Sequence, residues 1–265
     1  MNNYHMNDIF FNKECCYINL DDLCTRNGNL LDKFSILHIN INSLAANFNS
    51  LLCFLTKINF NFAIIVITET KLDSSCDSLY GIDGYNNISI NRNRHGGGIR
   101  LYYLRSVSIE IVSEMTGIFE SCEMLVSRVI LNNIKPILIY CIYRPPICNK
   151  RKFYDFITEN IENVSLCDID KILIGDFNID LNENLSINRD FYDLLSSKSF
   201  KLCITLPTYV PYNRNFPISI LDQIAINSVI PTESLIIDSK LSDHLPIALF
   251  YRVPSPIAPP SINCQ

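Results

Sequence analysis

Side chains that can bind metals or move protons collect in this sequence where apolar, strand-like stretches end. In chain order they are Asn40 and Asn42 after FSILHI, Glu69 after FAIIVIT, Tyr143 ending PILIYCIY, Asp176 and Asn178 after KILIG, Asp222 within SILDQIAI, and Ser242, Asp243 and His244 before LPIALFY. An α/β scaffold presents its ligand-facing side chains at such strand ends. Carboxylates and amides suit hard divalent cations, and one imidazole could handle a proton or a developing phosphoryl charge.

Taken singly, most of these residues have an ordinary structural explanation. Either asparagine after the first strand could cap a following helix, residues 175–178 could form a plain turn, and Glu69 could be a surface acid. Asp222 is harder to explain this way, because an unpaired carboxylate inside an apolar strand costs several kcal/mol, and His244 would supply its partner. We assign His38 to structure, as a strand residue with a satisfied ring.

Three other kinds of site are disfavoured by spacing. The chain has eleven cysteines but no C-x-x-C pair and only four histidines, which leaves little from which to build a structural zinc site. Ser242, Asp243 and His244 are consecutive and no G-x-S-x-G sequence occurs, so a serine-hydrolase relay cannot form. The glycines at 96–98 predict a turn, since they lack the spacing and the following lysine of a P-loop.

The elements that must position these residues follow from hydrophobic periodicity. Strands are expected at residues 34–39, 62–68, 99–104, 106–112, 125–131, 136–143, 171–175, 219–226 and 245–251. Helices are expected where apolar residues recur at helical spacing, over 44–58, 152–164 and 190–199, and turns at 81–87 and 96–98. Strands and helices alternate twice, which predicts two β-sheets packed face to face with helices on both outer sides.

Composition indicates one globular domain. Of 265 residues, 48% are hydrophobic and 18% charged, enough to bury a large core. We divide the chain into a polar leader at 1–33, a domain at 34–252 and a Pro-rich tail at 253–265. No apolar run approaches the length of a membrane span and the polar start is no signal peptide, so we expect a nuclear or cytoplasmic protein without a membrane partner.

The net charge is −5, which is the wrong sign for a protein that binds DNA by neutralising phosphates. A metal site built from carboxylates contributes several of these negative charges itself, and bound divalent ions would invert the local field. The overall charge therefore argues against a nucleic-acid partner but does not exclude one.

Taken in order, six fragments resemble the signature set of the endonuclease/exonuclease/phosphatase superfamily over about residues 34–252. They are Asn40–Leu44 (NINSL), Ile67–Lys71 (ITETK), Tyr143–Pro146 (YRPP), Gly175–Asn178 (GDFN), Leu221–Asp222 (LD) and Ser242–His244 (SDH). The YRPP, GDFN and SDHLP forms, with Gly84-Tyr85 and Arg94–Gly98, look specifically like the endonuclease of non-LTR (LINE or jockey-type) retrotransposons.

The resemblance implies a four-layer α/β sandwich, with two packed mixed β-sheets flanked by helices, and a role for each matching residue. Metal binding would fall to Glu69, Asn40 and Asp243, with Mg²⁺ as the ion and Mn²⁺ as its alternative. Catalysis would fall to Asp176, Asn178, His244, Asp222 and Tyr143, and substrate contacts to Asn42, Arg144 and Ser242. His244 could act as a base or as an electrostatic clamp; both remain open. Ser43 stands where the family usually has glycine, and a position that needs positive φ tolerates serine poorly.

The resemblance implies a Mg²⁺-dependent endonuclease that nicks one DNA strand and leaves a 3′-hydroxyl, with DNA as partner. Residues 86–98 and 205–217 would form the loops that set specificity. A reverse transcriptase domain in a longer parent protein would be a second partner. The alternatives are an abasic-site repair nuclease, a phosphatase or lipid phosphodiesterase of the same superfamily, and a retroelement remnant that has lost catalysis.

Overall fold

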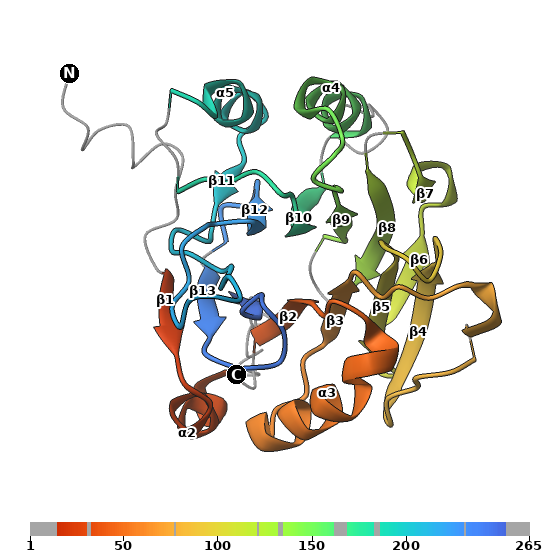
Figure 1. The fold of residues 1–265 in the computed structure, drawn as a ribbon, viewed down its shortest axis with the longest axis vertical. Coiled ribbons are helices and arrows are strands. Elements are labelled where there is room, and N and C mark those ends of the chain that lie inside the picture. The colour runs from red at the N-terminus through yellow and green to blue at the C-terminus, as the bar shows by residue number, and fades with distance from the viewer. Residues whose placement is uncertain are drawn as a thin grey trace, which may run out of the picture.

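The computed structural model describes residues 15–30, 33–76, 78–120, 122–131, 135–161, 169–182, 186–230 and 232–252. The expected Pro-rich tail, the first 14 residues of the expected leader and the last three residues of the helix expected at 152–164 lie outside these ranges. Within them the chain forms two seven-stranded sheets and four α-helices (Figure 1). No helix in the described part of the chain is long and apolar enough to cross a membrane.

Each sheet is mixed. The first sheet contains, in spatial order, β1 (Cys15–Ile18), β13 (Thr232–Ile237), β14 (Ile247–Arg252), β2 (Lys33–Asn40), β3 (Ile64–Thr68), β5 (Ile99–Leu104) and β4 (Tyr85–Ile90). The second contains β11 (Lys201–Leu202), β12 (Asp222–Ile226), β10 (Asp170–Asp176), β9 (Ile137–Tyr143), β8 (Glu123–Ile130) and β6 (Ser108–Ile111), with β7 (Gly117–Ile118) also pairing with β8. The helices are α2 (Leu20–Leu30), α3 (Leu44–Ile58), α4 (Lys150–Ile161) and α5 (Arg189–Ser197), with 3-10 turns η1 (Ser74–Cys76) and η2 (Ser113–Met115).

The helices form the two outer layers, so the predicted four-layer sandwich is confirmed. Figure 1 shows α4 and α5 at the top, α2 and α3 at the bottom, and the two sheets between them. One apolar cluster joins α3 to the first sheet through Leu51, Phe54 and Leu37, and a larger cluster includes residues of both sheets and of α4 and α5. Packing each sheet between helices and the other sheet buries both of its faces.

A parallel strand pair lies in the middle of each sheet. In the first sheet β2 and β3 are parallel and α3 connects them; in the second, β9 and β10 are parallel and α4 lies between them in the chain. Parallel neighbours need such a crossover, and it brings the carboxyl ends of both strands to the same edge. Asn40, Glu69, Tyr143 and Asp176 therefore end or follow strands whose ends meet.

Strand alternation decides which side chains face the second sheet. In β2, Leu37 and Ile39 belong to the cluster under α3, whereas Phe34 and Ile36 belong to the cluster shared with the second sheet. Successive side chains of a strand point to opposite faces, so His38 faces the second sheet as Ile36 does.

Some elements were not predicted. Residues 15–30, which we placed in a polar leader, form β1 and α2, and Ile18, Leu23 and Leu30 are buried. β4 begins at Tyr85, inside the stretch expected to be a turn, and β13 was missed. β1 pairs with β13, more than 200 residues later in the chain, a relation that local periodicity does not contain. The domain boundary at residue 34 stays a prediction.

Gly175 should be indispensable for the fold. Its φ is +150°, and a Cβ at this position would overlap the carbonyl oxygen of Ile142 on the neighbouring strand. We expect Gly175→Ala to lower the free energy of unfolding by about 3 kcal/mol or more, because backbone must move to accept the methyl group. Urea unfolding measures this; Gly81→Ala is the control, since nothing lies within 4 Å of a Cβ there. An unchanged midpoint for Gly175→Ala would contradict the expectation.

Candidate active site

A row of polar side chains crosses the second sheet. Strand register places Asp222 opposite Asp176, Asp176 opposite Tyr143, and Tyr143 opposite Glu123. Residues in register on adjacent strands project from the same face. Asp222, Asp176 and Glu123 are each at most 1% exposed, so three carboxylates share a buried face of the sheet.

Asp176 receives hydrogen bonds from both sheets. Asn40, at the end of β2 in the first sheet, donates Nδ2 to Asp176 Oδ2 at 2.9 Å. Asn178 donates its backbone N–H to Oδ1 at 2.9 Å and its Nδ2 to Oδ2 at 3.0 Å. Burial, followed by the charge of Asp222, raises the pKa of Asp176 well above its ordinary range despite these donors. Asp176 is thus a firmly held carboxyl group with unusual affinity for a proton.

His244 and Asp222 form the pair expected from the sequence. The Asp222 Oδ2 atom lies 2.7 Å from His244 Nδ1 and accepts a 2.7 Å hydrogen bond from Thr208 Oγ1. Burial alone would lower the pKa of His244, but the Asp222 carboxylate raises it to about 10. Burial would also raise the pKa of Asp222, and the charge and hydrogen bond of His244 outweigh it, so the pKa of Asp222 falls. At neutral pH the pair is an imidazolium next to a carboxylate.

Glu69 follows β3 and lies beside Asp176. Asn40 Nδ2 donates to Glu69 Oε1 at 3.1 Å as well as to Asp176, so one amide links the two carboxylates. Lys71 Nζ lies 3.6 Å from Glu69 Oε2, on the more exposed side. Burial, and then the charges of Glu69 and Asp176, raise the pKa of Tyr143 far above its ordinary value, so its hydroxyl stays protonated and can donate.

The loop that carries Glu69 is held by backbone contacts to the glycine turn. Thr70 and Lys71 donate their backbone N–H groups to the carbonyls of Gly98 and Gly97, at 3.2 and 2.8 Å. Gly98 in turn donates its N–H to the buried Glu123 at 2.5 Å. Glu123 therefore supports, through the turn, the backbone that places Glu69.

The remaining predicted residues gather at the edge of this cluster. Ser242 Oγ donates to the carbonyl of Asn40 at 2.6 Å, which ties the His244 loop to the end of β2. Asn42 Nδ2 lies 3.4 Å from Asp243 Oδ1, and Asn42 Oδ1 accepts from Lys71 Nζ. The structure thus brings these side chains close to Asn40, while their roles in metal and substrate binding stay predictions.

Arg144 lies beneath the Asp176–Asn178 loop. The residue is only 2% exposed, and its guanidinium donates to the carbonyls of Phe177 at 3.3 Å, Asn178 at 3.0 Å, and Cys148. Asn178 returns a hydrogen bond from Nδ2 to the Arg144 carbonyl at 2.8 Å. The geometry gives Arg144 a role in holding this loop, and its predicted contact with substrate stays untested.

Two groups of side chains could hold a metal ion. Asp176, Asp222 and His244 bring one ligand atom each within 4.8 Å of the others. His244 Nδ1 and Asp222 Oδ2 are already hydrogen-bonded to each other, so a metal there would have to break that pair. Glu69, linked to Asp176 through the Asn40 amide, fits a hard divalent cation better, because it offers carboxylate oxygens that lie outside the His244–Asp222 pair.

Sequence reasoning missed two residues of the site. Glu123 stands at the start of an apolar strand, where a glutamate is common and carries no signal of a site. Only its register with Tyr143 on β9 shows that it belongs to the row of polar side chains. Thr208 lies in a loop, where nothing in the local sequence predicts its contact with Asp222.

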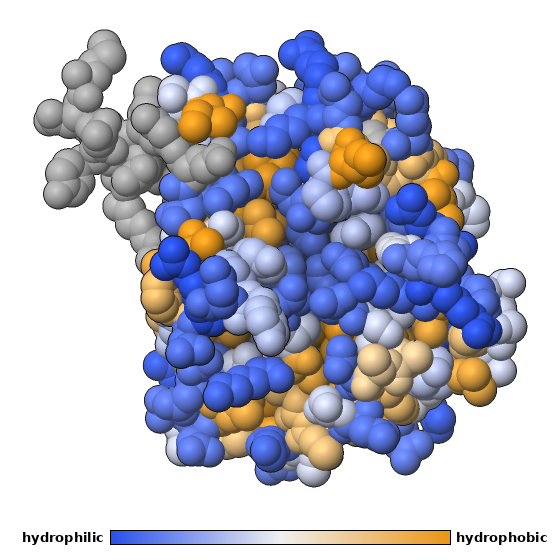
Figure 2. Space-filling view, viewed as in Figure 1, coloured by the Kyte–Doolittle hydropathy of each residue, from blue (hydrophilic) through white to orange (hydrophobic). Residues whose placement is uncertain are grey.

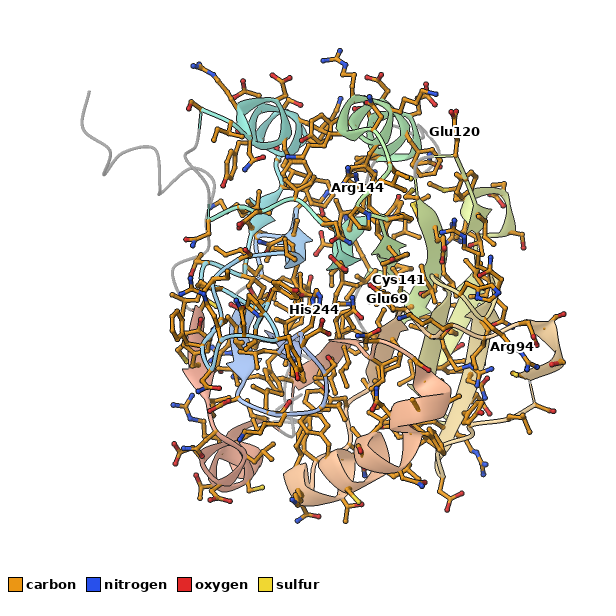
Figure 3. All side chains as sticks on the ribbon, in the orientation of Figure 1. Glu69, Arg94, Glu120, Cys141, Arg144 and His244 are labelled. Carbon is orange, nitrogen blue, oxygen red and sulfur yellow. The ribbon has the colours of Figure 1, made fainter. Side chains whose placement is uncertain are left out.

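The cluster lies centrally in the molecule. Figure 3 shows Glu69 and His244 near the middle of the view, with Arg144 above them and Arg94 at the right-hand edge. Hydrophilic residues extend across the middle of the same face (Figure 2). Polar groups therefore surround the junction of the two sheets on this side.

No protein-family model and no curated protein matches the chain. Solved structures match its fold. The endonuclease domain of TRAS1, a telomere-specific non-LTR retrotransposon, has a TM-score of 0.62 at 14% identity, covering 83% of this chain and 98% of that one. The Xenopus laevis APE2 catalytic domain gives 0.61 at 16%, covering 82% and 91%, and the human Nocturnin catalytic domain 0.60 at 15%, covering 83% and 93%.

At these identities the likeness shows the fold alone. This chain has the endonuclease/exonuclease/phosphatase fold, as the sequence resemblance implied. Structures with that fold include the endonuclease domain of a non-LTR retrotransposon, the group that the YRPP, GDFN and SDHLP forms resemble.

The His244–Asp222 pair should titrate far from the ordinary histidine range. With divalent cations removed, we expect the His244 ring to stay doubly protonated at pH 8, because its pKa is raised to about 10. A raised pKa means that the contribution of the pair to stability is full below about pH 6.5 and is lost as the pH rises toward 10. Ring nitrogen NMR measures the charge state, and Asp222→Asn should lower the pKa. A neutral His244 in wild type at pH 8 would refute this account.

Replacing Ser43 with glycine should stabilise the folded protein. Its φ is +99°, and its Oγ accepts only a 3.4 Å hydrogen bond from the N–H of Ala46 as N-cap of α3. We expect Ser43→Gly to raise the free energy of unfolding by about 1 kcal/mol, because relief of strain exceeds the few tenths lost with the cap. Ser43→Ala keeps the strain and loses the cap, so it should lower that energy by about 1 kcal/mol. Chemical denaturation compares them; equal stability of both variants would contradict the argument.

Proposed function

We propose that this protein is a divalent-cation-dependent phosphodiester hydrolase that acts on nucleic acid, and that it nicks one DNA strand to leave a 3′-hydroxyl. The observation that supports the proposal is that a group of carboxylates and a protonated histidine lie next to each other where the two sheets meet. Glu69 and Asp176, linked by Asn40, form an acidic centre, and the protonated His244 faces Asp176 from the first sheet. An acidic centre beside a cation suits activation of water next to a phosphate.

Asp176 is the group that accepts the proton of the attacking water. Burial raises its pKa to about 8 in the metal-free protein, and a divalent cation held beside it at Glu69 would favour the ionised carboxylate, which is the form that accepts a proton. Asn40 and Asn178 fix both of its oxygens, so the carboxylate does not reorient during proton transfer.

His244 faces the developing phosphoryl charge as an electrostatic clamp. A ring with a pKa of about 10 is already protonated at neutral pH, so it cannot serve as a base in that state. Asp222 fixes the ring through Nδ1, which leaves Nε2 to donate to a phosphate oxygen. The Tyr143 hydroxyl, protonated at neutral pH, supplies a further donor.

Mg²⁺ or Mn²⁺ would be held by Glu69, with Asn40 and Asp243 completing or supporting its shell, and would neutralise charge on the scissile phosphate. Asn42 and Ser242 would lie at the substrate side of the same cluster, and Arg144 would hold the loop that presents Asp176.

DNA as the substrate is supported by the motif forms and by the cations near the site. Lys71, Arg92 and Arg94 lie on the segments around Glu69 and the glycine turn, and each is paired there with a carboxylate, so these cations would exchange acidic partners for DNA phosphates on binding. Structures with this fold include the TRAS1 endonuclease domain and APE2. We propose a reverse transcriptase domain as the partner in a longer parent protein, and an intracellular, nuclear or cytoplasmic site of action.

Plasmid nicking tests the proposal. With Mg²⁺ we expect supercoiled DNA to become open circles with 3′-hydroxyl ends, and with EDTA no conversion. Asp176→Asn and His244→Asn should each lower the rate by about 10²–10⁴-fold, since each removes a group that acts in the transition state. Asp155→Asn is the matched control, because Asp155 is an exposed residue of α4 whose one ion pair among the described residues is with Arg151 in its own helix. Thermal unfolding verifies that each variant is folded.

The products distinguish the alternatives. Cleavage confined to abasic DNA would favour a repair nuclease, and release of phosphate from nucleotides or phosphoinositides would favour a phosphatase or lipid phosphodiesterase. Binding of DNA without any cleavage by folded wild-type protein at saturating Mg²⁺ or Mn²⁺ would overturn the proposal and favour a remnant that has lost catalysis.

A further inference from the structure

His38 occupies a position where an apolar side chain would be expected. It lies on the face of β2 that packs against the second sheet, in the same row as Phe34 and Ile36, and it is completely buried. Burying an imidazole in an apolar layer costs free energy unless its nitrogens are hydrogen-bonded. Its polar contacts therefore need an explanation that packing alone does not supply.

The ring lies between Thr68 and Asp222. His38 Nε2 is 3.0 Å from Thr68 Oγ1, on the adjacent strand β3. His38 Nδ1 lies 3.8 Å from Asp222 Oδ1, across the gap between the sheets. Both Nδ1 and Oδ1 are buried and have no hydrogen-bond partner among the described residues. Two unpaired buried polar atoms thus face each other, about 0.8 Å beyond the ordinary N–H···O length of roughly 3.0 Å.

Electrostatics selects one tautomer of the ring. A proton on Nε2 would leave the lone pair of Nδ1 pointing at the carboxylate oxygen, which is repulsive in a buried site. A proton on Nδ1 points at Asp222 Oδ1, and the Thr68 hydroxyl then donates to Nε2.

We propose that His38 is a positioning residue, whose Nδ1–H holds Asp222 Oδ1 and so fixes the carboxylate that orients His244. The opposite oxygen, Oδ2, already receives His244 Nδ1 and Thr208 Oγ1. Rotation of the carboxylate about its Cβ–Cγ bond would break the two hydrogen bonds to Oδ2 and turn Oδ1 away from the facing Nδ1–H. Two histidines, one from β2 and one from the loop before β14, therefore share one aspartate of the second sheet.

The catalytic meaning of this role rests on the proposed function, but the arrangement can be measured without turnover. Asparagine and glutamine separate the two ends of the ring. His38→Asn places an amide donor where Nδ1 stands and loses the contact to Thr68, whereas His38→Gln reaches toward Thr68 and loses the donor facing Asp222. The two variants are otherwise matched in chemistry.

The first measurement is NMR of the His244 Nδ1 proton. We expect the resonance of this hydrogen-bonded proton to persist in wild type and in His38→Asn, and to broaden or vanish in His38→Gln, because the unpinned carboxylate lets the bond to His244 fluctuate. Thr68→Val serves as a second variant that preserves side-chain shape. It removes the hydroxyl that donates to Nε2 and holds the ring in place, so it should also broaden the resonance.

The second measurement is nicking kinetics, done if the wild type turns over. We expect His38→Gln to lower kcat on the order of 10- to 100-fold with KM nearly unchanged, and His38→Asn to recover most of that loss. A merely structural role would make both variants unfold more readily and lose activity together.

Either measurement can overturn the proposal. An unchanged His244 Nδ1 resonance in both His38→Gln and Thr68→Val would show that His38 does not hold Asp222. Equal losses in His38→Asn and His38→Gln would show that the ring acts through packing alone. If the wild-type protein fails to nick, the proposed function falls while the NMR comparison still decides the role of His38.

Discussion

The hydrogen bond between Asn40 and Asp176 joins the two sheets at the point where the site lies, and the rest of the site depends on it. The His244–Asp222 contact crosses the same boundary, with its histidine in the first sheet's half and its aspartate on β12. Neither sheet alone contains an acidic centre and an imidazolium. The candidate site is therefore assembled only when the two sheets pack together and bring their polar side chains into contact. Burial of apolar side chains between the sheets is what stabilises this arrangement.

Much of this arrangement could be predicted from the sequence, because strand ends are visible in a pattern of apolar residues. Asp176 and His244 stand next to such strands, and their position in the site follows from that. Glu123 and Thr208 could not be found, since their contacts depend on strand register and on a loop path. His38 was assigned correctly to a buried strand, but the prediction of a satisfied ring was wrong, because Nδ1 has no hydrogen-bond partner among the described residues and faces Asp222 across the sheets.

Backbone conformation is the other part that the sequence concealed. Asn42, Ser43, Glu69 and Lys71 all have positive φ, and none of them is glycine. Local rules find left-handed positions by their glycines, so Asn42, Glu69 and Lys71 give little warning, whereas Ser43 was noticed because the family usually has glycine there. Non-glycine residues held in this region cost on the order of 1–3 kcal/mol each. Here the backbone N–H groups of Thr70 and Lys71 donate to the carbonyls of Gly98 and Gly97. These hydrogen bonds hold the strained segment that carries Glu69 and offset part of its strain.

The pairing of β2 with β14 has a consequence for the order in which the molecule forms. Ile36 lies opposite Leu249, so the first sheet joins the earliest central strand to the last described strand, while the second sheet is built entirely from the chain between them. Contacts this distant in sequence form slowly, because a long loop must close before any of them is gained. During synthesis the edge of β2 that pairs with β14 stays unpaired until β14 has left the ribosome. His244 arrives with that strand, so the His244–Asp222 pair of the candidate site forms only after β14 has been made.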